Sequence, residues 1–269
     1  MGVIVDWLVI GASIAFLLYM LATLAIVSRL FHHNGPNKNL VLSLAIMAIV
    51  VHGFNDSLLF FSQDTINFNL PNVISLVSLI ITFTFTLISI RFKVNLLLPV
   101  IYGFTGLWQL ALIFIPPVDT IPLIVEKLVL LSHISFALIA YCVLIIATLF
   151  AFQVTYINLK LKSKNLSAVA HLPPLMQVER QLFAILTIGT AILFVSQLIG
   201  FVFLEGFLNK ENAHKTLLSI LSLVIYSLIL WGHFKKGWRG HRILLLIIFA
   251  STLLTLAYFG SRFVKEFIL

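Results

Sequence analysis

Residues 128–153 read LVLLSHISFALIAYCVLIIATLFAFQ and contain no Asp, Glu, Lys or Arg. A helix of roughly 20 apolar residues crosses the hydrocarbon core of a bilayer, where it satisfies its own backbone hydrogen bonds. The stretch therefore predicts a transmembrane helix. Two of its side chains, His133 and Tyr141, carry polar groups that lipid does not solvate.

Similar apolar runs recur along the whole chain. Of its 269 residues, 61% are hydrophobic and 10% are charged, and the mean hydropathy is +1.13. A soluble domain has about a quarter of its residues charged, so this composition needs a membrane as its solvent. We predict a single all-α transmembrane domain over residues 1–269, a polytopic helix bundle of about eight spans. The predicted spans are residues 5–27, 40–60, 73–90, 96–115, 128–153, 183–204, 216–234 and 243–259.

The basic residues between these runs predict the orientation. If the N-terminus faces outward, twelve of the 17 Lys and Arg residues fall in cytoplasmic loops and five on the outer side. Both termini are then expected on the outer, periplasmic side. The longest loop, residues 156–181, is expected to be cytoplasmic, and Pro173-Pro174 within it predicts a short helix that runs into the sixth span. Residues 205–215 are expected to form a short outer loop.

Several classes of function lack the residues that they need. The single cysteine, Cys142, lies within a predicted span, so no internal disulfide and no Cys-x-x-Cys for covalent haem attachment is present. The net charge of +8 arises in short loops, where membrane orientation explains it, so no nucleic-acid partner is expected. We find no paired carboxylates, no nucleophile beside a base and no phosphate-binding glycine loop, and we predict no enzymatic activity.

Three histidines lie within predicted spans, where an ionisable side chain is a candidate functional group. His52 lies in the outer half of span two, His133 about one turn inside the outer end of span five, and His233 at the cytoplasmic end of span seven. His52 is roughly 12 Å and His133 roughly 6–8 Å from the outer end of its span, so their imidazoles can face each other. His233 is more than about 15 Å away, so the three cannot share one small metal ion. The remaining histidines fall in loops or at loop junctions: His32, His33, His171, His214 and His241.

These positions are compatible with a haem site, because haem iron takes a neutral histidine nitrogen as an axial ligand. Asp56 shares a helical face with His52 and is placed to orient its ring through the second nitrogen. Tyr141 lies two turns after His133 on the same face. A large flat ligand, or two separate sites, would accommodate the spacing of the three histidines.

A structural role is the alternative for each of these residues. A histidine in a membrane span can simply form a hydrogen bond to a neighbouring helix. His233 is also compatible with a place at the headgroup level, beside Trp231 and Trp238. Gln109 and Gln197 are expected to form interhelical hydrogen bonds. The residues by themselves leave both interpretations open.

Three stretches resemble a known family. The segment from His133 to Tyr141, continuing to Phe152, is similar to the His-x7-Tyr span of the cytochrome c assembly membrane proteins, the haem-handling family that includes CcsA and HemX. Residues 214–236 with the Lys-Gly-Trp-Arg-Gly loop that ends at Gly240 are similar to its late span. Residues 257–260, Ala-Tyr-Phe-Gly, match its last span. Residues 173–180 and 253–262 resemble more narrowly one branch of inner-membrane proteins, and the likeness covers roughly residues 40–269.

The resemblance implies that His133 is an outward-side haem ligand and that His233 is the family's histidine within the membrane. His52 matches only the narrower branch. Two features depart from the family pattern: residues 205–214 carry no tryptophan-rich motif, and residues 261–265 carry no second outer histidine. A surface that presents haem to apocytochrome is therefore missing, and this chain is not expected to be the haem lyase.

The leading hypothesis is a haem-binding integral protein of the bacterial cytoplasmic (inner) membrane that handles haem or assists cytochrome c assembly. Non-covalent haem b would have His133 and His52 as axial ligands, Asp56 as a partner of His52, Tyr141 in the pocket wall and His233 at a second site or on a path. Its expected partners are membrane lipid, haem, and cytochrome c maturation or haem-synthesis proteins. The alternative is a haem-independent regulator or scaffold acting through residues 160–180. A transporter has less support, because no paired halves are visible.

Overall fold

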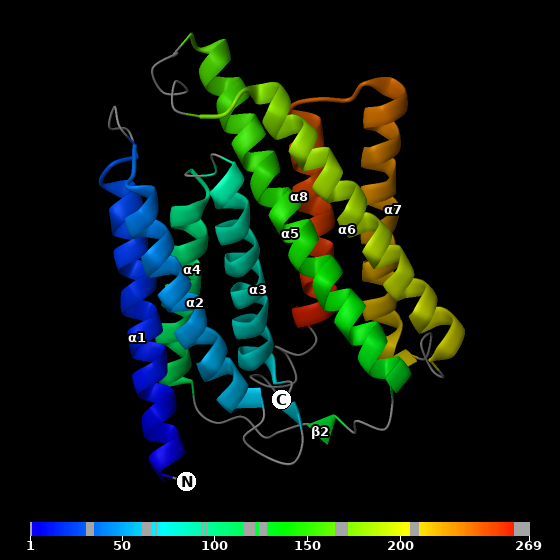
Figure 1. The fold of residues 1–269 in the computed structure, drawn as a ribbon. Helices are drawn as coiled ribbons and strands as arrows, with labels where there is room; N and C mark the ends of the chain where they lie inside the picture. The colour runs from blue at the N-terminus through cyan, green and yellow to red at the C-terminus, as the bar shows by residue number, and fades with distance from the viewer. Residues whose placement is uncertain are drawn as a thin grey trace. The chain divides into compact units, whose positions relative to one another are not determined.

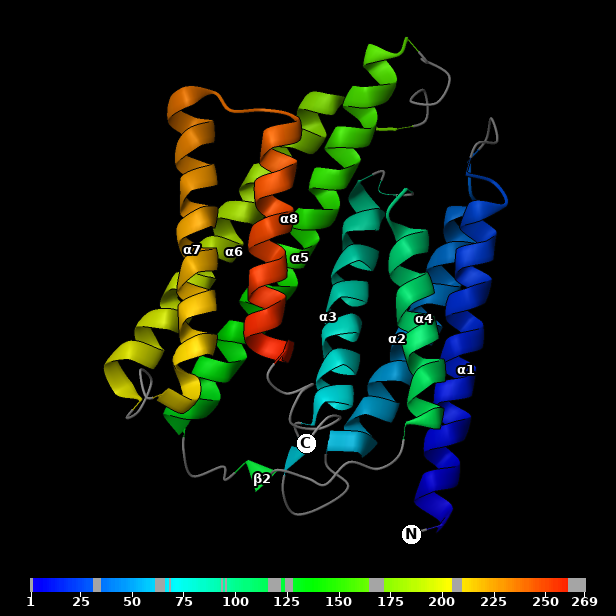
Figure 2. The ribbon, with the colours of Figure 1, turned by 180° about the vertical axis from the view of Figure 1, so that it is seen from behind.

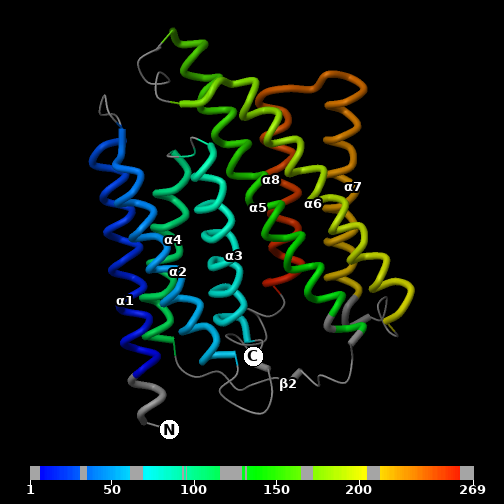
Figure 3. Tube along the Cα trace, viewed as in Figure 1, coloured from blue at the N-terminus to red at the C-terminus, as the bar shows by residue number. Residues whose placement is uncertain are grey.

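The structure is a computed structural model that describes residues 2–30, 35–60, 66–67, 69–92, 94, 96–115, 122–123, 128–164, 172–204 and 210–260. These residues form eight α-helices and one pair of two-residue strands (Figures 1 and 3). The helices are α1 (Gly2–Val27), α2 (Lys38–Phe60), α3 (Leu70–Arg91), α4 (Leu98–Phe114), α5 (Leu128–Lys162), α6 (Leu175–Phe203), α7 (Lys210–Lys236) and α8 (His241–Thr255). A π-helical turn, η1 (Leu256–Gly260), continues α8, and the strands β1 (Ile66–Asn67) and β2 (Pro122–Leu123) pair antiparallel.

The chain divides into two compact units, each with four helices. The first comprises Met1–Ile124 with Ser167–Pro173, and the second comprises Val125–Leu166 with Pro174–Leu269. In the first unit, α1 packs along both α2 and α4, and α3 contacts α2 and α4. In the second unit, α5 packs on α6 and α8, and α7 lies beside α8, as Figure 2 shows from behind.

The helical multi-pass fold that the sequence predicts is confirmed. Seven of the described helices are long and apolar enough to cross a membrane. The remaining one, α4, is apolar but has only 17 residues. The predicted sides of the two termini stay a prediction.

Helix ends differ from the predicted span ends. α5 continues through Lys162, nine residues beyond the apolar run, and the ammonium of Lys160 lies 5.6 Å from the ring centre of Tyr156. A helix can leave the hydrocarbon and continue among headgroups, where hydropathy gives no signal for its end. α6 begins at Leu175, directly after Pro174, as the proline pair predicted. The loop predicted over residues 156–181 is therefore shortened from both sides, and residues 165–171 within it lie outside the described residues.

Of the predicted outer loop over residues 205–215, residues 205–209 lie outside the described residues, and α7 begins at Lys210. Four further parts of the chain also lie outside the described residues: His32, His33, His171 and residues 261–265.

Burial follows the rules of a membrane protein. Large apolar side chains face outward on many helices, for example Phe54 at 64% and Phe201 at 65% exposure. Hydroxyl and amide side chains are buried instead, among them Ser75, Gln109 and Ser222. Lipid supports an apolar exterior, while small and polar residues join helices inside the bundle. The interior of each unit is therefore where polar chemistry lies.

Candidate functional site

In the first unit, His52 lies at the centre of a buried polar cluster that draws on all four helices. The residue is fully buried on α2. Its Nδ1 lies 3.2 Å from the hydroxyl of Tyr19 on α1. Its Nε2 lies 3.0 Å from Oγ of Ser75 on α3 and 2.7 Å from Nε2 of Gln109 on α4. Both ring nitrogens are thus engaged within the unit, and ligation of iron through either would require one of these bonds to break.

Asp56 is bound mainly by Ser75. Its Oδ1 accepts a hydrogen bond from Ser75 Oγ at 2.6 Å, while its Oδ2 lies 3.4 Å from Nε2 of His52. The predicted contact between His52 and Asp56 is therefore present. However, Nε2 cannot donate to Asp56 while it accepts from the Gln109 amide, because an imidazole nitrogen holds either a proton or a lone pair. Asp56 Oδ2 has no hydrogen bond among the described residues, and the role of His52 as an iron ligand stays a prediction.

In the second unit, His133 lies in the second turn of α5 and contacts α6. Its Nδ1 is 2.8 Å from the backbone carbonyl oxygen of Ser196, and Ser196 Oγ donates to the carbonyl oxygen of His133 at 3.2 Å. A carbonyl oxygen only accepts, so Nδ1 carries a proton, and in the neutral form of the ring Nε2 then carries the lone pair. A hydrogen bond to a carbonyl at one ring nitrogen is the usual support of a histidine that ligates a metal through the other.

Tyr141 lies two turns further along α5 and joins it to the end of α8. Its hydroxyl is 3.1 Å from Oγ1 of Thr255. Its ring centre lies 5.9 Å from that of Tyr258 and 5.1 Å from that of Phe259, both in η1. Tyr141, which we predicted to line a haem pocket, is therefore part of an aromatic cluster between α5 and η1.

His233 is held by the loop that follows α7. Gly237 adopts a left-handed φ of 65°, which ends the helix at low cost. The chain then turns back, so that the Trp238 amide donates to the carbonyl oxygen of Gly232 at 3.1 Å and His233 Nδ1 lies 3.2 Å from the carbonyl oxygen of Trp238. A Cβ on Gly232 would overlap the Trp238 ring, so only glycine permits this packing. The imidazole stacks on the ring of Phe183, with ring centres 3.3 Å apart.

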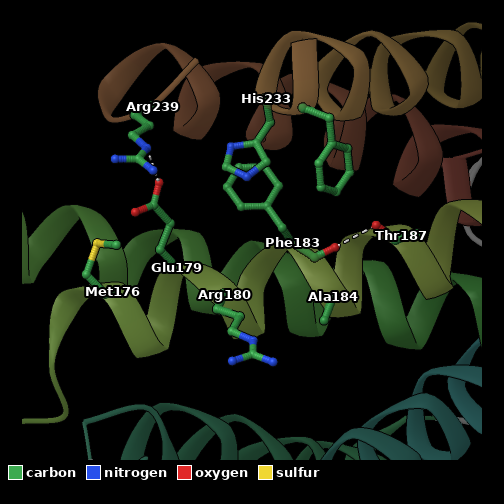
Figure 4. A pocket seen from close by; sticks show the side chains of 9 residues that line it. Met176, Glu179, Arg180, Phe183, Ala184, Thr187, His233 and Arg239 are labelled. Atoms are coloured by element: carbon green, nitrogen blue, oxygen red, sulfur yellow. Dashed lines mark hydrogen bonds and ion pairs between the residues drawn. The ribbon is translucent and has the colours of Figure 1, made fainter. Parts of the chain in front are cut away.

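A cavity of about 330 Å³ surrounds this stacked pair at the end of the unit where α6 begins and α7 ends. Figure 4 shows His233 over Phe183, with the ion pair of Arg239 and Glu179 further along α6 toward its N-terminus. Nε of Arg239 lies 3.2 Å from Oε1 of Glu179. The volume of this cavity is near the lower end of the range that is typical of ligand pockets. Its lining residues are Met176, Glu179, Arg180, Phe183, Ala184, Thr187, His233, Phe234 and Arg239.

The two candidate site histidines of the second unit, His133 and His233, mark separate places. His133 contacts α6 at Ser196 and His233 contacts it at Phe183, 13 residues earlier. At 1.5 Å per residue these contacts are roughly 20 Å apart along α6. This agrees with the prediction that His233 is too far from His133 to share one small metal ion. His52 belongs to the first unit, so the predicted pairing of His52 with His133 stays a prediction.

One known protein family matches almost the entire chain. Residues 7–269 match the family described as cytochrome C assembly protein. The chain belongs to this family. The resemblance predicted from the sequence is thereby confirmed.

Two relatives of this cytochrome c assembly family member extend the comparison. The inner membrane protein YpjD of Escherichia coli K12 is 36% identical over 259 residues, covering 96% of this chain and 98% of YpjD. Protein HemX of Brevibacillus brevis is 26% identical over 225 residues, covering 79% of this chain and 82% of HemX. YpjD represents the narrower branch predicted from residues 173–180 and 253–262. No solved structure matches the chain.

Sequence reasoning found the histidines of this family member but not the groups that hold them. Gln109 and Gln197 were predicted to join helices, and this is confirmed: Gln197 Nε2 donates to Ser219 Oγ at 2.6 Å. Tyr19 and Ser75 were missed, because hydroxyl residues occur in most of the spans. The carbonyl of Ser196 was missed because a backbone acceptor leaves no trace in the sequence.

Proposed function

We propose that this cytochrome c assembly protein binds haem b non-covalently in its second unit and stores or relays it without ligating it to apocytochrome. The observation that carries the proposal is the 2.8 Å contact of His133 Nδ1 with the carbonyl oxygen of Ser196. It leaves Nε2 as the nitrogen with the lone pair, the form of imidazole that haem iron binds. Membership of a family described by cytochrome c assembly, and similarity to HemX, support the same function.

The donor atoms that the chain offers at His133 are compatible with haem binding. Among the described residues, no three His, Cys, Asp or Glu side chains gather as a metal site. An iron that arrives with its four porphyrin nitrogens needs only one or two protein ligands, which a lone imidazole can supply. When bound, haem would supply an iron that accepts and releases one electron. The chain's own contribution is to hold the imidazole of His133 in one tautomer and to surround it with apolar spans.

The ligation step itself is not part of the proposal. Residues 205–214 carry no tryptophan, and no second histidine follows the last span in residues 261–265. A chain that binds haem without these features is suited to hold it for another protein. The expected environment is the bacterial inner membrane, as the name of YpjD states for that relative.

The test is the haem content of the purified full-length chain from haem-replete cells. We expect an absorption spectrum with a Soret band, and an acid–acetone extract that removes the haem completely, because no Cys-x-x-Cys is present to bind it covalently. A pyridine haemochrome spectrum should identify haem b at about one per chain. A colourless preparation from such cells would contradict the proposal.

A colourless preparation would favour the alternative of a regulator or scaffold that works without haem. In that case a partner captured through residues 160–180 should bind equally well to wild-type protein and to the His133→Ala variant. Loss of that capture in the variant would instead mean that the partner interaction depends on His133.

A further inference from the structure

The cavity beside His233 lies at a strongly basic end of the second unit. α5 and α7 end here, while α6 and α8 begin here (Figure 2). Among the described residues at this end, Glu179 is the single acidic side chain. The basic ones are Lys160, Lys162, Lys164, Arg180, Lys235, Lys236, Arg239 and Arg242. A ligand here meets an excess of seven positive charges, which favours an anion.

The same end carries the marks of the boundary between membrane and water. The ammonium of Lys236 lies 4.8 Å from the ring centre of Trp231, which is half exposed. Tryptophan and lysine side chains gather at the headgroup level, where each has an apolar body and a polar tip. The cavity therefore opens where phospholipid headgroups lie.

The lining of the cavity is amphiphilic. Met176 and Phe234 are 67% and 66% exposed, and Phe183 forms the floor under His233. Arg239 is 62% exposed while its partner Glu179 is 13% exposed, so the guanidinium extends into solvent from a largely covered carboxylate. Arg180 extends from α6 away from His233 (Figure 4). A ligand that matches this surface has an anionic head beside Arg239 and an apolar tail along Met176 and Phe234.

We infer that this cavity is a binding site for an acidic phospholipid of the bilayer, whose phosphate lies against Arg239 and whose acyl chain lies along Met176 and Phe234. Basic pockets between transmembrane helices bind acidic headgroups in this way. A soluble anion would gain nothing from the exposed apolar side chains, and a zwitterionic lipid would gain little from the excess of positive charge. The site is independent of the proposed haem function, which rests on His133.

The test is native mass spectrometry of the full chain released from mixed micelles that contain phosphatidylglycerol and phosphatidylcholine in equal amounts. Wild-type protein is expected to retain phosphatidylglycerol preferentially. Each basic side chain near an acidic headgroup contributes about a fivefold gain in affinity. The Arg239→Gln variant is therefore expected to bind phosphatidylglycerol about fivefold more weakly.

Two further variants make the test specific. Lys235→Gln removes the same charge from the same end outside the cavity lining, and it should retain the lipid better than the arginine variant. Ala184→Phe keeps every charge but fills the cavity from an exposed position that tolerates a larger side chain, and it should lose the lipid. This variant reports on the site even if the arginine variant folds poorly.

Three results would contradict the inference. One is an equal loss of phosphatidylglycerol in the arginine and lysine variants, which would indicate diffuse attraction to the surface. Another is equal retention of phosphatidylcholine by the wild-type protein. The third is a Soret band that falls in Ala184→Phe while lipid retention is unchanged, which would assign the cavity to haem.

Discussion

The His133→Ala variant is expected to purify with more than about tenfold less haem than the wild-type chain. The Ser196 carbonyl fixes the position of the Nδ1 proton of this imidazole and leaves Nε2 for the metal in the neutral form. Loss of an outer hydrogen-bond partner alone typically costs 10–100-fold in metal affinity, and loss of the ligand should cost at least as much. The measurement is the ratio of Soret absorbance to protein, with folding checked by circular dichroism.

His241→Ala is the matched control for this variant. His241 begins α8 and is exposed, so its removal should leave the haem content unchanged. An equal fall in both variants would mean that the loss reflects general damage. Full retention of haem by folded His133→Ala protein would remove His133 from the site.

The His52→Leu variant is expected to be the most destabilising single change in the first unit, by roughly 2–4 kcal/mol. It removes contacts to Tyr19, Ser75 and Gln109 at once. Interhelical hydrogen bonds in membrane proteins average only about 0.6 kcal/mol, but each buried polar group left without a partner adds about 1–3 kcal/mol. Gln109 Nε2 keeps its hydrogen bond to Ser75 Oγ at 2.8 Å. The Tyr19 hydroxyl and the second N–H of Gln109 lose His52 as their partner and therefore determine the size of the effect, which unfolding in a denaturing detergent can measure.

Ser57→Ala provides the reference on the same helix. Ser57 is exposed and donates only to the carbonyl oxygen of Phe54, so this change should stay within about 0.5 kcal/mol. A His52→Leu chain as stable as wild type would refute the structural role of the cluster. The haem content of the folded His52→Leu variant also tests the predicted role of His52 as an iron ligand. If the variant retains haem, His52 has a packing role. If the variant loses haem, His52 is assigned to the iron.

The sequence was sufficient for the number and kind of the long helices. An apolar run such as residues 128–153 has only one stable conformation in lipid, so periodicity and length predict it directly. The ends were less predictable, since α5 continues to Lys162 in a region where polar residues are equally compatible with loop and helix. The division into two compact units was not predicted either, because helix packing depends on small and polar contacts that occur in every span.

The candidate site was predictable at its histidines and not at their surroundings. The contact of His52 with Asp56 followed from helical spacing alone. The stacking of His233 on Phe183, and the turn that brings the Trp238 carbonyl to its ring, depend on a left-handed Gly237 and on the crossing of α6 with α7. Neither can be read from one sequence, in which Phe183 is one of 24 phenylalanines.

The most direct measurement of the central claim, that the His133 imidazole binds haem iron, is chemical rescue of a His133→Gly variant. This change leaves a space where the imidazole lay, and free imidazole can enter it and ligate the iron. We expect purified His133→Gly protein to lack a wild-type Soret band, and to regain it when haem and imidazole are added together but not with haem alone. A wild-type spectrum from His133→Gly protein with haem and no imidazole would contradict the claim.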